Sequence, residues 1–474
     1  MSQAPLPELA EEPLGHGLKQ RHLTMLGLGG VIGAGLFVGS GAGITVAGPG
    51  IVLSYLFAGT LAMLVMRMLG EMSAAMPASG SFSVHAERAM GRWAGFSVGW
   101  LYWFLLVVVL AVEATGAAKI ANGWVPAVDQ WVWVLVFMVV FTVSNLAAVR
   151  NFGEFEFWFA ALKVGAIVLF LILGTLAIFG LLPDTDPIGF TNLTGQGGFL
   201  PNGWEGVISG VLAVVFAFGG LEVVTIAAAE SEDPARSVAR AVRSAVWRIL
   251  FFYVGSMLVI VTLLPWTSMT PGMSPYVQVL DSIGIPAAGQ IMNIVVFVAL
   301  LSALNANLYG SSRMVFSLAE RGEAPKGLLA VSPGGVPRRA VFASVAFGFG
   351  SVVLNLLWPD TIFLYMLNAV GAVLLFVWAL IAVSQLRLRR RIEQTTPERL
   401  TLKMWAFPYL TWAALAGMAA VLVLMLTDEA ARPQVLWSAG AAALVLAVAG
   451  IRELRARRAP EEPEDRPAGP QVRR

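Results

Sequence analysis

Long runs of apolar residues, separated by short polar stretches, dominate this chain. Within each run the apolar residues cover every helical face, whereas a helix on a soluble protein carries a single apolar stripe. A membrane-spanning helix needs about 20 such residues. The predicted spans cover residues 22–46, 51–73, 93–118, 131–149, 156–180, 205–229, 244–265, 287–318, 340–358, 361–386, 404–427 and 434–451. We therefore predict an all-α integral membrane protein with twelve transmembrane helices, since the strands of a β-barrel would alternate in hydrophobicity.

Glycines interrupt two of these spans near their middle. The segment from Gly30 to Gly35 interrupts the first span, and Phe218, Gly219 and Gly220 interrupt the sixth. An unpaired backbone group in hydrocarbon costs several kcal/mol, so a helix breaks there only where it faces protein, a cavity or a ligand. Glycines also permit close helix packing, which is the alternative interpretation. Their matched positions favour a substrate site at the bilayer midplane.

The matched positions also predict an inverted repeat. The first five spans together begin inside and end outside, so the sixth span begins outside. The next five spans therefore run with reversed polarity. The predicted organisation is an N-terminal tail at 1–21, a transporter domain at 22–451 and a C-terminal tail at 452–474. Within the domain, repeat one covers 22–180, repeat two covers 205–386 and two extra spans cover 404–451.

The basic residues predict the orientation, because Lys and Arg accumulate in cytoplasmic loops. With the N-terminus inside, only Lys119 and Arg432 of the 31 basic residues fall outside, and Lys163 lies within the fifth span. The two longest outer connections, 181–204 and 266–286, contain neither Lys nor Arg. We therefore expect a multi-pass protein of the plasma membrane with both termini in the cytoplasm.

Composition excludes several classes of function. The chain has no cysteine and three histidines, all in or near predicted cytoplasmic segments, so no metal site or cofactor is expected. Its net charge of +2 is explained by topology, and the loops are too short for a nucleic-acid-binding domain. The expected partners are the lipid bilayer and a small substrate. The sequence implies no covalent chemistry, so an enzyme is not expected. It does not predict an oligomeric state.

The two breaks predict the chemistry of the substrate. The N-terminal end of the outer half of span one presents free N–H groups, which attract a carboxylate. The carbonyls that end the inner half, near Ile32, and those of Ala217 and Phe218 accept hydrogen bonds from an ammonium group. A zwitterionic substrate could bind the N–H groups with its carboxylate and the carbonyls with its ammonium group. The predicted substrate-binding residues are Ile32, Gly33, Ala34, Gly35, Phe216, Ala217, Phe218, Gly219, Gly220 and Asn305.

Asn305 joins this set because a polar side chain in span eight must find a partner inside the bundle. That partner is either the substrate or a neighbouring helix, and the sequence leaves both open.

Lys163 is the basic residue placed deepest in a span, where an unpaired charge costs about 2.5–3.5 kcal/mol. We expect its ammonium to take carbonyls near Gly30 and the hydroxyls of Ser311 or Ser312 as acceptors. A proton on Lys163 would then replace a sodium ion as the coupling ion. Burial disfavours the charged form of a lysine, so Lys163 could gain and lose this proton during transport. The alternative is a lysine that extends to the cytoplasmic headgroups.

Two glutamates complete the set of predicted buried charges. Glu222 follows the second break and has no basic neighbour in its span, so it is protonated, bonded to freed backbone N–H groups, or near Lys163. It serves proton coupling or braces the unwound segment. The predicted proton-coupling residues are Lys163, Glu222, Ser311 and Ser312. Glu113, near the outer end of span three, is expected to be solvated and structural.

Several motifs resemble those of a known family. They are Leu18–His22, Gly30–Gly35, Ser79–Phe82, Gly153–Trp158, Ala227–Ser231, Ser312–Met314 and Ala382–Leu386. The chain resembles bacterial amino acid permeases of the amino acid–polyamine–organocation superfamily, with GABA permeases as the nearest likeness. The resemblance runs from about Leu18 to the end of span twelve.

This resemblance implies a LeuT-type fold with a five-plus-five inverted repeat and two additional C-terminal helices. It also implies proton-coupled import of an amino acid without sodium, with Lys163 and Glu222 at positions where the family carries a lysine and a glutamate. The segment from Phe218 to Glu222 looks more like permeases for aromatic amino acids, so GABA and a neutral α-amino acid both stay open. A channel and a non-transporting nutrient sensor are the rivals from other classes.

Overall fold

The computed structural model describes most of the chain as helices. The described residues are 32–76, 81–147, 152–183, 186–222, 234–270, 272–332, 336–429 and 432–458. The predicted N-terminal tail, the inner half of the first span with Gly30, and residues 223–233 lie outside this set. Every regular element within the described ranges is helical.

Most of the helices follow the predicted spans in order along the chain. Their bounds are α2 Ser40–Ala47, α3 Ile51–Ala75, α4 Ser81–Met90, α5 Arg92–Trp124, α6 Gln130–Ala147, α7 Phe152–Ile178, α8 Thr191–Thr194, α9 Gly203–Val214, α11 Pro234–Leu263, α12 Pro275–Ser282, α13 Ala288–Glu320, α14 Arg338–Leu357, α15 Ile362–Thr395, α16 Tyr409–Thr427 and α17 Arg432–Arg458. The short turns are η1 Gly35–Gly39, η2 Gly48–Gly50, η3 Val215–Phe218, η4 Trp266–Ser268, η5 Lys326–Leu329 and η6 Pro397–Arg399.

Eight helical segments in the described part of the chain are long and apolar enough to cross a membrane, and two shorter apolar helices cover Gln130–Leu146 and Leu250–Leu263. The first of the eight, Gly35–Ala75, contains a sharp turn at Gly48, whose φ of 59° lies in the left-handed region that favours glycine. The turn separates α2 from α3, so this segment supplies two helices rather than one.

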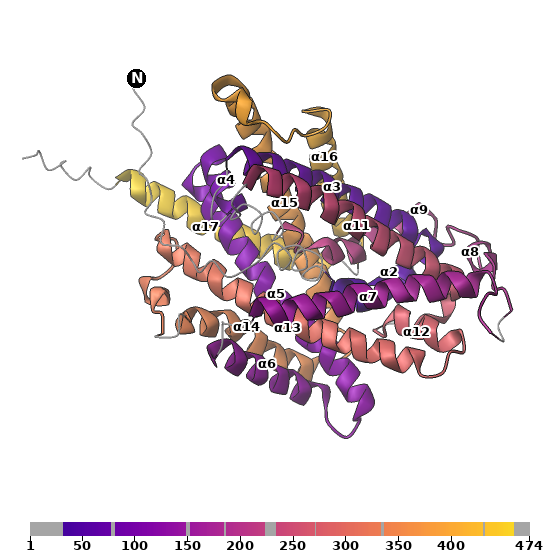
Figure 1. Cartoon of the computed structure of the whole chain (residues 1–474). Helices are drawn as coiled ribbons and strands as arrows, with labels where there is room; N and C mark the ends of the chain where they lie inside the picture. Colours follow the sequence, from indigo (N-terminus) through magenta and orange to yellow (C-terminus); the bar gives the residue numbers. More distant parts are fainter. Residues whose placement is uncertain are drawn as a thin grey trace, which may run out of the picture.

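Helix α5 runs through the middle of the bundle (Figure 1). It packs against α4, α6, α13, α14, α15 and α17, and the stretch from Leu105 to Ala118 is buried throughout. A helix that is apolar on every face suits this position, because no side of it meets water. Any charged side chain on this stretch must therefore find a partner within the protein.

Helix α7 lies between α11 and α13 and has one face toward the surface of the bundle (Figure 1). Its outward residues include Trp158, Leu169 and Ile172, each more than half exposed, as expected for side chains in contact with lipid. The opposite face carries Lys163, which is only 1% exposed.

The last helix, α17, packs on α15, α5 and α16. Near its end, Arg452 donates to the carbonyl oxygens of Gly322 at 2.6 Å and Glu323 at 2.9 Å, just after α13 ends. A cation at the C-terminal end of a helix compensates its exposed carbonyls. The predicted extra spans are therefore fastened to the core.

Candidate substrate site and the buried charges beside it

The first half of predicted span six, helix α9, ends where the sequence predicts an interruption. Helix α9 gives way to the tight turn η3, which ends at Phe218. Gly219 then adopts an extended backbone with ψ of 142°, and Gly220 has φ of 96°. A positive φ strains residues with a β-carbon, so glycine suits this turn. The break lies inside the protein, because Val215–Phe218 are all buried.

The second half of predicted span one begins at a similar interruption. Ile32 and Gly33 are not helical, and the chain enters a π-helical turn, η1, at Gly35 before continuing into α2. Phe37 N–H donates to Gly33 carbonyl oxygen at 3.1 Å, which closes the first turn. Ile32 and Ala34 are fully buried, so this helix terminus also faces the interior.

The two interruptions are in contact. A β-carbon at Gly35 would lie 2.7 Å from Ala217 Cα and 2.8 Å from Phe216 Cδ1, closer than real side chains approach. Glycine is therefore required where the two broken segments meet. The structure thus brings together Gly35, Phe216 and Ala217, three of the predicted substrate-binding residues.

The Phe218 side chain is not part of this contact and packs against two tyrosines. Its ring lies 5.1 Å from that of Tyr253 and 5.9 Å from that of Tyr55, measured between centroids. These tyrosines belong to α11 and α3, so Phe218 packs between two helices that flank the break.

Glu113 occupies the helix terminus that the sequence assigns to a substrate carboxylate. Ala34 N–H donates to Glu113 Oε1 at 3.1 Å and to Oε2 at 3.2 Å. A β-carbon at Gly33 would meet this same carboxylate, and Ala303 Cβ would lie 3.4 Å away. The expectation that Glu113 is solvated is wrong, because its side chain is 2% exposed. The packing of α5 against six other helices buries this carboxylate, and the sequence alone does not show that packing.

Lys163 is buried and pairs with a glutamate on its own helix. Its Nζ lies 3.8 Å from Glu156 Oε1, and both side chains are 1% exposed. Ser302 on α13 donates its hydroxyl to Glu156 at 3.1 Å to Oε1 and 3.0 Å to Oε2. The interpretation of Lys163 as a lysine extending to the headgroups is therefore wrong. Sequence reasoning missed Glu156, although seven residues, or about two helical turns, place it on the same face as Lys163.

The hydroxyls of Ser311 and Ser312 have acceptors within α13. Ser311 donates to Leu308 carbonyl oxygen at 3.1 Å, and Ser312 donates to Tyr309 carbonyl oxygen at 2.9 Å. Both residues are buried. The other predicted acceptor for Lys163, near Gly30, lies outside the described residues.

Asn305 bridges two helices. It accepts a hydrogen bond from Asn145 of α6, with Asn145 Nδ2 2.8 Å from Asn305 Oδ1. Ala303 lies near Gly33, and Asn305 is two residues, or about 200°, further around the helix. The structure therefore points Asn305 away from the first break and shows the second of its two predicted environments, which is helix bridging.

Glu222 accepts hydrogen bonds beside the second break. Its Oε2 accepts from Gly220 N–H at 2.9 Å, and its Oε1 accepts from the indole N–H of Trp378 on α15. Of the three predicted environments, the structure shows the one in which backbone N–H groups freed by the break bind the carboxylate. Glu222 is fully buried and Trp378 is 1% exposed. Sequence reasoning missed Trp378, which is distant along the chain.

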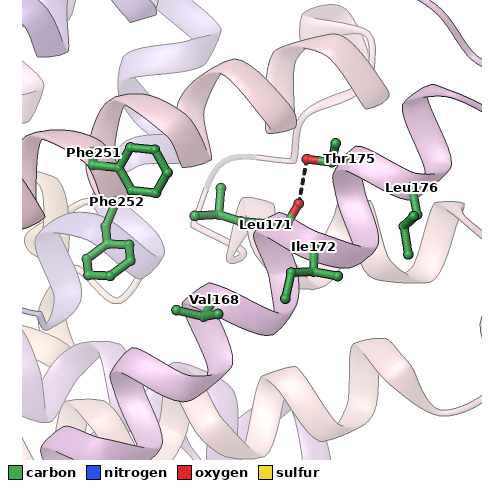
Figure 2. Close-up of a pocket in the computed structure, with 7 residues that line it drawn as sticks. All are labelled: Val168, Leu171, Ile172, Thr175, Leu176, Phe251 and Phe252. Atoms are coloured by element: carbon green, nitrogen blue, oxygen red, sulfur yellow. Dashed lines mark hydrogen bonds between the residues drawn. The ribbon is translucent and has the colours of Figure 1, made fainter.

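A groove of about 390 Å³ lies between α7 and α11 and provides a contrast to this site. Figure 2 shows Phe251 and Phe252 opposite the residues of α7 that line it. The lining residues are Val168, Leu171, Ile172, Thr175, Leu176, Phe251 and Phe252. The one hydroxyl among them, on Thr175, donates to Leu171 carbonyl oxygen at 2.7 Å. The groove is thus suited to lipid chains and has no group to hold a zwitterion.

These features define the class of protein. Two helices interrupted in contact with each other inside a bundle of apolar helices, with buried charged groups beside them, are typical of a membrane transport protein. The model of the amino acid permease family matches residues 22–451, and the chain belongs to this family. It is a multi-pass membrane transporter of amino acids and not an enzyme.

Named relatives cover nearly the whole chain. The γ-aminobutyric acid permease of Bacillus subtilis is 49% identical over 429 residues, which is 90% of this chain and 92% of that protein. The aromatic amino acid transport protein AroP of Corynebacterium glutamicum is 50% identical over 430 residues, again 90% of this chain and 92% of that protein. A probable GABA permease of Pseudomonas aeruginosa is 47% identical over 97% of this chain and 96% of that protein.

Among solved structures, a manganese transporter of Eremococcus coleocola has the same fold, with a TM-score of 0.58. The match covers 94% of this chain and 97% of the other, at 15% sequence identity. At this identity the likeness concerns the fold alone.

Proposed function

We propose that this permease imports a neutral amino acid together with a proton by alternating access. The observation that carries the proposal is the contact between the two interrupted segments, where Gly35 meets Phe216 and Ala217. The substrate ammonium would bind carbonyl oxygens near Ala217 and Phe218. Its carboxylate would bind the N–H groups of Ile32 to Gly35, which the helix terminus makes electropositive.

Glu113 competes for this carboxylate site. Its two oxygens already accept from Ala34 N–H, so an arriving substrate carboxylate would take the place of the Glu113 carboxylate. Glu113 also lies within electrostatic range of Lys163, so its displacement by a substrate would change the electrostatic environment of the lysine. Binding of substrate and the charge state of the lysine would thereby be coupled. This exchange is the physical link that we propose between substrate and proton.

Lys163 would carry the coupling proton. Its ammonium lies 3.8 Å from the Glu156 carboxylate and within electrostatic range of Glu113, so loss of the proton would change the charge balance of all three groups. We expect the Lys163→Ala variant in proteoliposomes to lose pH-gradient-driven accumulation while still exchanging preloaded substrate. Unchanged accumulation in this variant would remove the proposed role.

GABA and aromatic amino acids are the two candidate substrate classes. The relatives named for GABA and for aromatic amino acids match this chain at nearly equal identity, 49% and 50%. A competition panel against labelled GABA, including phenylalanine, tyrosine and small neutral amino acids, would decide between them. We expect one class to inhibit uptake at concentrations at least tenfold lower than the other.

Accumulation itself tests the transporter proposal against its rivals. A proton-coupled permease concentrates substrate above equilibrium under an inward proton gradient. Uptake that never exceeds equilibration would instead identify a channel, and binding without uptake in the same vesicles would identify a sensor.

We also propose the LeuT-type arrangement of twelve spans, with both termini in the cytoplasm of a bacterial cell. The breaks in the first and sixth spans support the two repeats. The chain has no native cysteine, so single substitutions report orientation directly. In intact cells an impermeant maleimide should label a Thr270→Cys variant and not a Ser2→Cys variant. The reverse result would overturn the orientation.

A further inference from the structure

Glu156 lies where a proton could leave Lys163. The two residues share one face of α7, and Glu156 is the fifth residue of that helix while Lys163 is the twelfth. Their seven-residue separation corresponds to about 10 Å along the helix axis, which the two side chains bridge by extending toward each other. In the proposed orientation, the Glu156 end of α7 is the cytoplasmic end.

The carboxylate of Glu156 is held in place from a second helix. The Ser302 hydroxyl of α13 donates to either oxygen of Glu156, at 3.0 and 3.1 Å. A buried acid with one hydroxyl donor and one ammonium neighbour can accept a proton without losing its position, because the hydroxyl bonds either form.

The groups that face this pair are few among the described residues. From α5, Glu113 lies within electrostatic range of Lys163. From α11, Tyr253 lies within range of Glu113. From α12, the ring of Tyr276 packs on Phe170, seven residues beyond Lys163 on α7. From α13, Ser302 contacts Glu156 directly. Two carboxylates therefore interact with the lysine, Glu113 at the first break and Glu156 seven residues before Lys163 on α7.

We propose that Glu156 receives the transported proton from Lys163 and releases it to the cytoplasm. In this step an N–H bond of the Lys163 ammonium breaks and an O–H bond forms on the Glu156 carboxylate. The products are a neutral amine and a neutral carboxylic acid, and the acid then loses its proton to cytoplasmic water when the site opens inward. The inference rests on the proposed proton coupling and assigns its exit residue.

The alternative is that Glu156 only neutralises a buried lysine. A Glu156→Gln variant separates the two roles, because the amide keeps an acceptor oxygen for Ser302 but cannot be ionised. Glu398→Gln is the matched control, since Glu398 is exposed in η6 and distant in sequence from α7.

The experiment uses right-side-out proteoliposomes of the full chain with an inward proton gradient and varied lumenal pH. We expect Glu156→Gln to lose at least tenfold in accumulation and to lose its dependence on lumenal pH, while exchange of preloaded substrate stays within about twofold of wild type. Glu398→Gln should behave as wild type in all three measurements.

Two results would overturn the inference. The first is wild-type accumulation in Glu156→Gln. The second is loss of exchange along with accumulation in a Glu156→Gln protein that unfolds at the wild-type temperature, because Glu156 would then serve reorientation rather than proton release.

A second variant keeps the test decisive if Glu156→Gln does not fold. Ser302→Ala removes the hydroxyl donor and leaves both charges, and we expect it to shift the lumenal pH of half-maximal accumulation by at least half a unit. An unshifted pH profile would count against the relay. If wild-type protein accumulates nothing under a proton gradient, the proposed function itself fails, which is distinct from a failure of Glu156 alone.

Discussion

Gly33 has no side chain, and the Glu113 carboxylate fills the space where a β-carbon would lie. We predict that Gly33→Val reduces substrate uptake at least tenfold, because the new side chain displaces Glu113 and covers the helix terminus beside Ala34. Initial uptake rates and substrate affinity measure the effect. Gly165→Val is the matched control, since an added β-carbon at this exposed position of α7 meets nothing within 4 Å. Normal affinity in Gly33→Val would contradict the carboxylate site.

His85, on α4 outside the membrane-spanning helices, predicts a pH dependence of stability. Its ring is fully buried, with Nε2 3.3 Å from the Ser73 hydroxyl, and burial together with the nearby Arg88 lowers its pKa to about 3. The unfolded residue has a pKa of about 6.5. At a pH between these two values the unfolded chain binds a proton that the folded protein does not. The free energy of unfolding therefore falls as the pH drops through this range, by up to about 1.4 kcal/mol per pH unit.

We therefore expect the His85→Gln variant to lose less stability than wild type between pH 6.5 and pH 4.5. Thermal unfolding of the purified protein at the two pH values measures the difference. The carboxylates that also titrate in this range are common to both proteins, so they cancel in the comparison. Equal losses in the two proteins would show that His85 titrates normally.

The sequence shows which residues are unusual but not which way they face. Lys163 was identifiable as a buried charge because of its depth in an apolar span, whereas its partner Glu156 required the geometry of both side chains. For Asn305 the sequence left the pocket and helix bridging open, and the structure directs it toward Asn145, because the rotation of a helix about its axis cannot be obtained from composition alone. Glu113 is buried, contrary to the expectation from its place near the outer end of span three, because neighbouring helices surround α5.

At the scale of helices, the break in span six is held by a contact from another span. Trp378 of α15 donates to the Glu222 carboxylate, which also accepts from Gly220 N–H. We predict that Trp378→Phe destabilises the protein by about 1–3 kcal/mol, since it removes a hydrogen bond to a buried carboxylate, and that it slows uptake. Unfolding temperature and initial uptake rate are the measurements. Trp358→Phe, at an exposed position after α14, should change neither.

The interruptions themselves were predictable because glycines mark both of them in the sequence. Gly220 adopts a backbone that disfavours other residues, and Gly35 makes room for a neighbouring backbone. The same applies to the turn at Gly48, between two predicted spans. The serines of α13 show the limit of this reasoning, because Ser311 and Ser312 can bond carbonyls of their own helix as readily as a distant lysine.

At the scale of the whole molecule, a buried cluster ties three parts of the chain together. Glu71 of α3 accepts from Arg389 and from Gln385 at 2.8 Å, both on α15, and from the backbone N–H of Met404 before α16. We predict that Arg389→Met costs about 3–5 kcal/mol, because it leaves a buried carboxylate without its cation. Denaturation in detergent measures this, with the exposed Arg390→Met as control.

The double variant Glu71→Gln with Arg389→Met sharpens this prediction. Removing both charges should recover part of the lost stability, because no unpaired charge is then buried. An additive loss in the double variant would show that the pair contributes nothing as a pair.

The order of spans and their apolar character came from hydrophobicity, since the bilayer imposes a length and composition on every helix. The central position of α5 did not, because packing between apolar helices depends on small differences of shape that leave no simple pattern. The contacts of Arg452 with Gly322 and Glu323 likewise join residues far apart in the sequence.

The hydrogen bond from Ala34 to Glu113 has a consequence for the unloaded carrier. A vacant binding site normally leaves amide dipoles facing empty space, which penalises any conformation that closes around it. Here the protein supplies its own acceptor, so closure without cargo leaves that amide satisfied. We therefore expect the resetting half of the cycle to proceed without a counter-substrate, and net uptake to be sustained when the far compartment contains no exchangeable amino acid.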